Sequence, residues 1–195
     1  HFRATILLAA ADVASLADRR NADGDWLSFE AILPAADRRR FSGRVQLIGP
    51  EGLSVISDID DTIKITEVTD HEAMIDNTFL RPYRSVPGMT ELYQQWAQRG
   101  AVIHFVSASP WQLYEPLTEF MGMEGFPAAT FHLKTFYWKD SRFLSLFADP
   151  IEYKLGVIEP VMKSFPKRQF ILVGDSGEKD PEVYGLLARR YPDQV

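Results

Sequence analysis

The sequence predicts an α/β fold in which a central parallel sheet is covered by helices on both faces. From about residue 51 onward, short apolar strand candidates alternate with amphipathic helix candidates. The strand candidates are almost continuously apolar, which is typical of parallel strands because both of their faces are buried. A length of 195 residues suits one such domain with a short additional segment. We therefore expect the domain to span 51–195 and an accessory segment to span 1–50.

The first 50 residues predict the end of a β-rich region rather than a complete domain. Residues 1–20 favour a helix, and turn-forming residues follow at 21–25. Two strand candidates then lie at 26–33 and 43–48, with a proline and an arginine cluster between them. We expect a short N-terminal β accessory segment here.

The elements of the main domain follow in regular order. Strands are predicted at 53–57, 101–106, 129–133 and 169–173, and helices at 89–98, 110–121, 152–164 and 181–190. Gly100 ends the first of these helices. Pro110 suits the first turn of the second helix. Pro160 should kink or break the third helix, because proline lacks the backbone donor that a helix interior needs.

Composition excludes several classes of function. The chain has no cysteine, so disulfides, thiolate metal sites and cysteine nucleophiles are excluded. Its net charge is −6, which disfavours generic nucleic-acid binding through a basic surface. No apolar run approaches the ~20 residues of a membrane span. The expected location is cytoplasmic, with peripheral membrane contact as a further possibility.

Polar residues capable of chemistry follow the predicted strands, at the sheet edge where ligands bind in such folds. They are Asp58, Asp60 and Thr62 after the first core strand, Ser107 after the second, Asp175 and Asp180 after the last, and Lys154 in the preceding helix. Several converging carboxylates repel one another unless a cation neutralises them, and oxygen ligands suit Mg²⁺. A lysine and a serine beside them would complete the equipment for phosphoryl transfer.

These residues, in this order, resemble the four motifs of the haloacid-dehalogenase superfamily of aspartyl phosphatases. The string from Pro50 to Lys64, with Gly174-Asp175-Ser176-Gly177 and Asp180-Pro181-Glu182, is similar to the catalytic domain of the actin-patch-associated phosphatidate phosphatase family. The resemblance covers roughly 44–194. It implies a Rossmann-like core with a small cap or flap. The family would supply another core strand after the last helix, so we expect a partial chain.

The resemblance also implies roles for individual residues. Asp58 would attack phosphorus and form an aspartyl-phosphate, while Asp60 would protonate the leaving oxygen and then deprotonate water. Ser107 and Lys154 would bind the phosphoryl oxygens, and Thr62 would fix the loop that holds Asp58. Each residue taken alone has a structural alternative, such as a cap or a surface turn.

Mg²⁺ is the cofactor that the resemblance implies. Asp58, the backbone carbonyl of Asp60 and Asp175 would hold it, and Asp180 would lie behind them or reach the ion through water.

The segment between Thr62 and Gly88 is longer than an ordinary strand-to-helix loop and resembles the superfamily's flap. Thr69 and Glu72 fit a capping box, which predicts a short helix to about Phe79. After it, Arg81 and Arg84 are candidate contacts for an anionic headgroup.

Lys134 is a further substrate contact of the same kind. The segment 134–147 is rich in aromatic and basic residues and predicts a hairpin over the site. This hairpin either packs on the core or lies at a bilayer surface.

The predicted function is Mg²⁺-dependent hydrolysis of a phosphomonoester, with phosphatidate or a related lipid phosphate as the favoured substrate. The same chemistry on a sugar phosphate or nucleotide stays open. So does an inactive phospholipid-binding module, against which the intact acidic residues argue. The lipid assignment rests on the resemblance alone.

Overall fold

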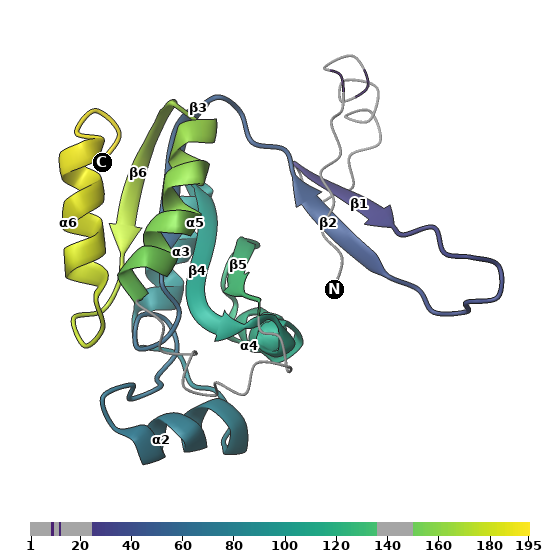
Figure 1. Cartoon of the computed structure of the whole chain (residues 1–195), viewed down its shortest axis with the longest axis horizontal. Helices are drawn as coiled ribbons and strands as arrows, with labels where there is room; N and C mark the ends of the chain where they lie inside the picture. The colour runs from purple at the N-terminus through teal and green to yellow at the C-terminus, as the bar shows by residue number, and fades with distance from the viewer. Residues whose placement is uncertain (1–8, 10–11, 13–24, 136–149) are drawn as a thin grey trace. The chain divides into compact units, whose positions relative to one another are not determined.

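A computed structural model of the chain describes residues 9, 12, 25–135 and 150–195 (Figure 1). The chain divides into two compact units, 1–49 and 50–195. In the first unit, strands β1 (Trp26–Glu30) and β2 (Ser42–Gln46) form an antiparallel pair. Both predicted strands of this unit are present but shorter than expected. The helix predicted over 1–20 lies outside the described residues, apart from 9 and 12.

A four-stranded parallel sheet forms the centre of the second unit, with the order β5-β4-β3-β6. Its strands are β3 (Glu51–Ser57), β4 (Val102–Pro110), β5 (Thr130–Lys134) and β6 (Lys167–Val173). The prediction of an α/β fold with a central parallel sheet is therefore confirmed. Strand β3 lies between β4 and β6, so the residues that leave its carboxyl end have neighbours on both sides.

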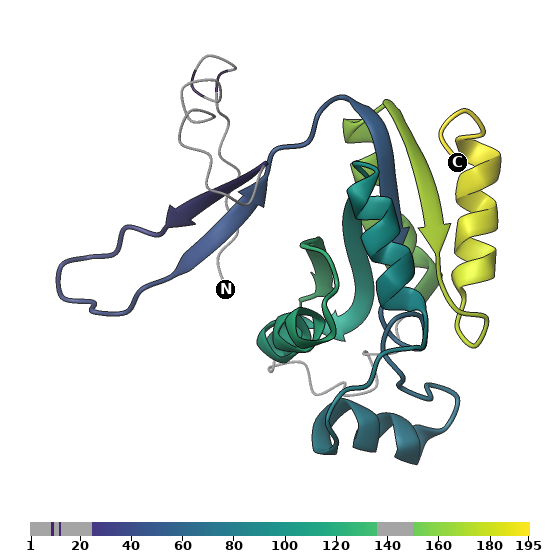
Figure 2. The same ribbon diagram turned by 180° about the vertical axis from the view of Figure 1, so that it is seen from behind.

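Helices cover both faces of this sheet. They are α3 (Met89–Gln98), α4 (Tyr114–Glu124), α5 (Pro150–Ser164) and α6 (Asp180–Arg190). Helix α5 lies in front of the sheet in Figure 1, and α3 lies in front of it in Figure 2.

The alternation of side chains along β3 explains this layering, because successive residues of a strand point to opposite faces. Val55 packs in one core cluster with Tyr93 of α3. Its neighbour Ile56 packs in the other cluster with Ile158 of α5 and Leu187 of α6. Both β3 residues are completely buried, so a shift of one residue in register would exchange the two cores.

A flap follows β3 and contains helix α2 (His71–Ile75), which continues into the π-helical turn η1 (Asp76–Leu80). The helix lies beyond the end of the sheet to which the arrow of β6 points (Figure 1). The predicted helix is therefore present and ends near the expected residue. Its cap was predicted wrongly, because Asp70 rather than Thr69 accepts the backbone N–H groups of the first turn.

Two proline predictions need correction. Pro110 is extended at the end of β4 and pairs with Lys134, so a 3₁₀ turn, η2 (Trp111–Leu113), separates it from α4. Pro160 lies inside α5 and does not break it. The buried side chains of Ile158 and Met162 on either side of Pro160 hold this part of α5 against the sheet. None of the helices in the described part of the chain has the length and apolar character needed to cross a membrane.

Candidate active site

The site lies where three neighbouring strands end together. Ser57, the last residue of β3, is aligned with Phe105 of β4 and Val173 of β6. The backbone N–H of Asp58 then donates to the carbonyl of Val173 over 2.9 Å. This bond fixes the first residue beyond β3 at the carboxyl edge of the sheet.

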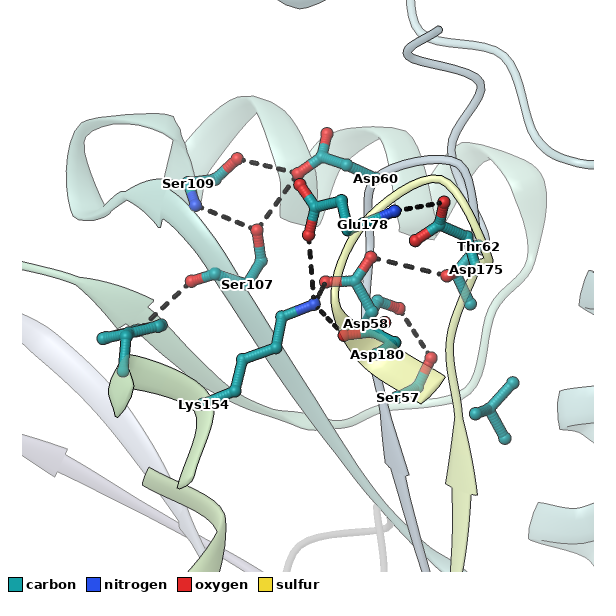
Figure 3. A network of polar contacts seen from close by, with 12 residues as sticks. Ser57, Asp58, Asp60, Thr62, Ser107, Ser109, Lys154, Asp175, Glu178 and Asp180 are labelled. Carbon is teal, nitrogen blue, oxygen red and sulfur yellow. Dashed lines mark hydrogen bonds and ion pairs between the residues drawn. The ribbon is translucent and has the colours of Figure 1, made fainter. Parts of the chain in front are cut away.

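Lys154 of α5 lies at the centre of an acidic cluster (Figure 3). Its Nζ donates to Asp58 Oδ1 over 2.9 Å, to Glu178 Oε2 over 3.2 Å, and to Asp180 Oδ1. The side chains of Lys154 and Asp180 are each only 1% exposed. The cluster therefore places one ammonium among three carboxylates, largely out of contact with water.

The negative charge of this cluster is not fully compensated. Burial raises the pKa of Asp58 well above its usual range, and the charges of Asp180 and Asp60 raise it further, although Lys154 opposes them. Burial likewise raises the pKa values of Glu178 and Asp180. Such shifts mean that a further cation at this position would stabilise the ionised carboxylates.

The donor set fits a metal ion. One carboxylate oxygen each from Asp58, Asp175 and Asp180 lies within 4.8 Å of the others. Asp175 Oδ2 accepts the backbone N–H groups of Gly177 and Glu178 over 2.6 and 3.2 Å. Its other oxygen, Oδ1, is buried and has no hydrogen-bond partner among the described residues. A buried carboxylate oxygen of this kind needs a donor or a cation, and hard divalent cations prefer oxygen ligands.

Gly174 makes room for this arrangement. A Cβ at Gly174 would overlap Oδ2 of Asp180, so a larger residue would displace that carboxylate. The glycine therefore permits the close approach of the β6 end to the start of α6.

Both carboxylate oxygens of Asp60 have polar partners. Lys64 Nζ and Thr66 Oγ1 contact its Oδ1 at 2.9 and 2.8 Å. The hydroxyls of Ser107 and Ser109 donate to its Oδ2 over 3.1 and 3.0 Å. Burial tends to raise the pKa of Asp60, but the Lys64 charge and these hydrogen bonds outweigh burial and lower it.

The structure also places the other predicted catalytic residues in this network. Thr62 Oγ1 lies 3.4 Å from Asp58 Oδ2, at the limit of a hydrogen bond. Ser107 contacts Asp60, and its hydroxyl also accepts the N–H of Ser109. The structure thus brings together every acidic, hydroxyl and lysine residue that the motifs suggested.

The three predicted substrate contacts lie on the flap and at the end of β5. Arg81 is on the flap and pairs with Asp76 over 2.8 Å, and the neighbouring Arg84 is exposed. Lys134 ends β5, with its ammonium 5.8 Å from the ring centroid of Tyr153. The Tyr153 hydroxyl donates to the Ser107 carbonyl, so Tyr153 lies between Lys134 and the site. Residues 136–147 of the predicted hairpin lie outside the described residues.

Several residues that support the site were not predicted from the sequence, namely Asp61, Lys64, Thr66, Ser109 and Glu178. Asp61 has a φ of 54°, a left-handed conformation that aspartate tolerates better than most residues. Its carboxylate accepts the backbone N–H groups of 66, 67 and 68, each over 2.7 Å. The signal that could have identified Asp61 is a third acidic residue, directly after Asp60, in the string Asp58-x-Asp60-Asp61.

Comparison with known proteins gives sequence matches over most of the chain. The family model described as "Phosphatidate phosphatase APP1, catalytic domain" matches residues 53–195. Phosphatidate phosphatase APP1 of Saccharomyces cerevisiae is 36% identical over 152 residues, which are 76% of this chain and 25% of that protein. An uncharacterized protein of Schizosaccharomyces pombe is 27% identical over 161 residues, covering 80% of this chain and 26% of its own length.

A class C acid phosphatase from Bacillus anthracis with tungstate bound is similar in structure, with a TM-score of 0.44 and 12% identity. The match covers 74% of this chain and 63% of that one. The chain spans about a quarter of the length of the curated relatives it matches. The family match covers the whole parallel sheet apart from the first two residues of β3, and all the residues of the site. The chain therefore belongs to the family of the phosphatidate phosphatase APP1 catalytic domain, a family of phosphoric monoester hydrolases.

Proposed function

We propose that this chain hydrolyses a phosphomonoester with the help of Mg²⁺, and that Asp58 carries the phosphoryl group between the two halves of the reaction. The observation that carries this proposal is the Asp175 oxygen that has no hydrogen-bond partner in the described part of the chain and lies beside the Asp58–Lys154 pair. It supports a cation site next to a buried carboxylate that can act as a nucleophile.

In the first half-reaction, an Asp58 carboxylate oxygen attacks phosphorus and the ester P–O bond breaks. The pKa of Asp60 is lowered in the free site, but the negative charge of the bound phosphoryl group raises it, so that Asp60 takes up a proton. Asp60 gives this proton to the leaving oxygen, and the product is a neutral alcohol. Lys154 and the Ser107 hydroxyl bind phosphoryl oxygens. Lys154 already contacts Asp58, so its ammonium lies where negative charge develops.

In the second half-reaction, Asp60 takes a proton from water, and the resulting hydroxide attacks phosphorus. The bond from phosphorus to Asp58 breaks, which releases inorganic phosphate and restores the carboxylate. Asp60 thus ends protonated and ready for another substrate.

Asp58, Asp175 and Asp180 would hold Mg²⁺, which when bound supplies positive charge to the phosphoryl oxygens and offsets the repulsion among these carboxylates. The three acidic residues come from two neighbouring strand ends, so the sheet brings the ligands together. Thr62 and Gly174 support the positions of Asp58 and Asp180.

We propose phosphatidate or a related lipid phosphate as the substrate, reached by peripheral contact with a membrane. Support comes from the name of the S. cerevisiae relative and of the matched family. We further propose that 51–195 is the catalytic domain and that 1–50 is an accessory segment.

The test is phosphate release from a short-chain phosphatidate in mixed micelles, measured with Mg²⁺ and with EDTA. The native chain and Asp58→Asn are compared, with an aryl phosphate as the soluble reference. We expect release from the lipid that requires both Mg²⁺ and Asp58. Release from the aryl phosphate alone would contradict the lipid substrate, and release by Asp58→Asn at the native rate would contradict the mechanism.

A further inference from the structure

An apolar groove of about 360 Å³ separates the flap from helix α4. Its apolar lining comes from η1 and the following turn on one side and from η2 and α4 on the other. These side chains are Phe79, Tyr83, Leu113, Pro116, Phe120 and Met123. A groove of this size and composition is within the range that binds small organic ligands.

The floor of the groove is held by packing and a hydrogen bond. The rings of Tyr83 and Phe120 meet edge to face with their centroids 5.7 Å apart. The Tyr83 hydroxyl donates to the carbonyl of Thr78 over 3.1 Å, and Phe120 is only 2% exposed. An incoming ligand would therefore meet a preformed surface and would not have to order it.

The rim of the groove, in contrast, exposes large apolar side chains to water. Phe79 is 64% exposed and Met123 is 76% exposed. Covering these side chains with another apolar group would remove water from them, which is favourable in proportion to the area covered.

The charges at the groove favour an uncharged occupant. The Arg81 guanidinium is already paired with Asp76 over 2.8 Å. Glu119 also lines the groove and would repel an anionic group. A phosphate or carboxylate is therefore disfavoured there, whereas a hydrocarbon chain is not.

Tyr83 lies between the groove and the active site. The Lys64 ammonium lies 4.9 Å from the centre of the Tyr83 ring, and the same ammonium lies 2.9 Å from Asp60. Asp60 is the residue that gives a proton to the leaving oxygen in the proposed mechanism. The carbon chain attached to that oxygen therefore starts beside Asp60, and the contacts of Lys64 with Asp60 and Tyr83 place the groove within reach of such a chain.

We infer that the groove between η1 and α4 holds the hydrocarbon chain of the alcohol that leaves phosphorus. This inference rests on the proposed function, because it uses Asp60 as the leaving-group acid. It assigns substrate selection to the flap and α4: the acidic cluster binds the phosphoryl group, and the groove distinguishes a long alkyl ester from a short one.

The experiment uses butyl, hexyl and octyl phosphate, each below the concentration at which it forms micelles, so that no lipid surface is present. For the native chain, kcat/KM should rise by up to about fourfold for each methylene that the groove buries. The Phe79→Ser/Met123→Ser variant should show a much shallower rise, with its largest loss of kcat/KM on octyl phosphate and its smallest on butyl phosphate. Both side chains are largely exposed, so the fold should be retained.

Ile75→Ser/Leu80→Ser is the matched control. These two side chains belong to the same helical segment and are 39% and 73% exposed, but neither lines the groove. This variant should keep the native dependence on chain length. An equal loss in both variants, or a native rate that is independent of chain length, would overturn the inference.

A binding measurement separates the groove from the proposed chemistry. Calorimetry of the three alkyl phosphates with Asp58→Asn, alone and combined with Phe79→Ser/Met123→Ser, reports chain binding without turnover. Affinity that rises with chain length only when the groove is intact supports the inference even if the native chain hydrolyses none of these esters. Affinity independent of chain length overturns it even if hydrolysis occurs.

Discussion

The ammonium of Lys64 lies 2.9 Å from the carboxylate of Asp60, within one tight turn beyond β3. The Lys64 side chain is 1% exposed and that of Asp60 is 13% exposed, so the pair is almost fully removed from water. A carboxylate in such a place is stable only while its counter-charge remains. Lys64 thus fixes the position and the ionisation of the residue proposed as the acid and base.

Replacing Lys64 by methionine should therefore lower the free energy of unfolding by about 3–5 kcal/mol, because Asp60 is left as a buried, unpaired charge. Urea unfolding of Lys64→Met, Asp60→Asn and the double variant measures the coupling between the two residues. The double variant should be less destabilised than the sum of the single variants. Strict additivity would contradict a direct ion pair.

Asp61 should show an unusual order of stability between its glycine and alanine variants. Both variants lose the three backbone hydrogen bonds that the Asp61 carboxylate accepts. Alanine additionally disfavours the left-handed conformation at φ 54°, by about 1 kcal/mol, whereas glycine adopts it freely. In thermal unfolding, Asp61→Gly should therefore have a higher Tm than Asp61→Ala. The opposite order would mean that the turn relaxes when the carboxylate is removed.

Mg²⁺ should stabilise the folded chain through Asp175. A ligand present at a hundred times its dissociation constant raises the free energy of unfolding by about 2.7 kcal/mol. Asp175→Asn should need at least about tenfold more Mg²⁺ for the same gain, because the amide replaces a charged ligand. The control is Asp193→Asn, at an exposed position near the end of the chain. If both variants gained the same free energy of unfolding at the same Mg²⁺ concentration, Asp175 would not be a ligand of the ion.

His104 should make stability depend on pH. Burial lowers its pKa to about 3, with smaller contributions from His132 and Arg168. In the unfolded chain the pKa is about 6.5, so the unfolded state binds more protons and stability falls as pH drops below 6.5. At pH 5.5 this loss amounts to about 1.4 kcal/mol. Urea unfolding measures the free energy of unfolding at pH 7.5 and at pH 5.5. The difference between the two values should be smaller for His104→Gln than for the native chain.

The sequence predicted the sheet well because its strands are apolar and separated by clear helix and turn signals. Helix α3 was predicted at its observed bounds, since its apolar period and the following Gly100 agree. The extension of β4 to Pro110 was missed, because pairing with Lys134 determines it and local propensity does not.

The same distinction applies to the site. Asp58, Lys154 and Asp175 could be predicted because their order along the chain is recognisable. Asp58 and Asp175 follow predicted strands, and Lys154 lies in a predicted helix. Lys64 could not, because its contact with Asp60 depends on the way that the turn folds back on itself. The position of Ser109, which also contacts Asp60, depends on the extension of β4 beyond its predicted end.

The active site is assembled from distant parts of the chain, and this has a consequence for folding. Ser107 is 47 residues from Asp60, and Lys154 is 96 residues from Asp58. Parallel pairings that close such long loops form slowly compared with local contacts. A nascent chain that has joined β3 to β4 would already hold Asp60 and Ser107, yet it would lack the lysine and the Asp175 loop. The proposed site should therefore be complete only after β6 has docked. Partly folded chains should not hydrolyse phosphate esters.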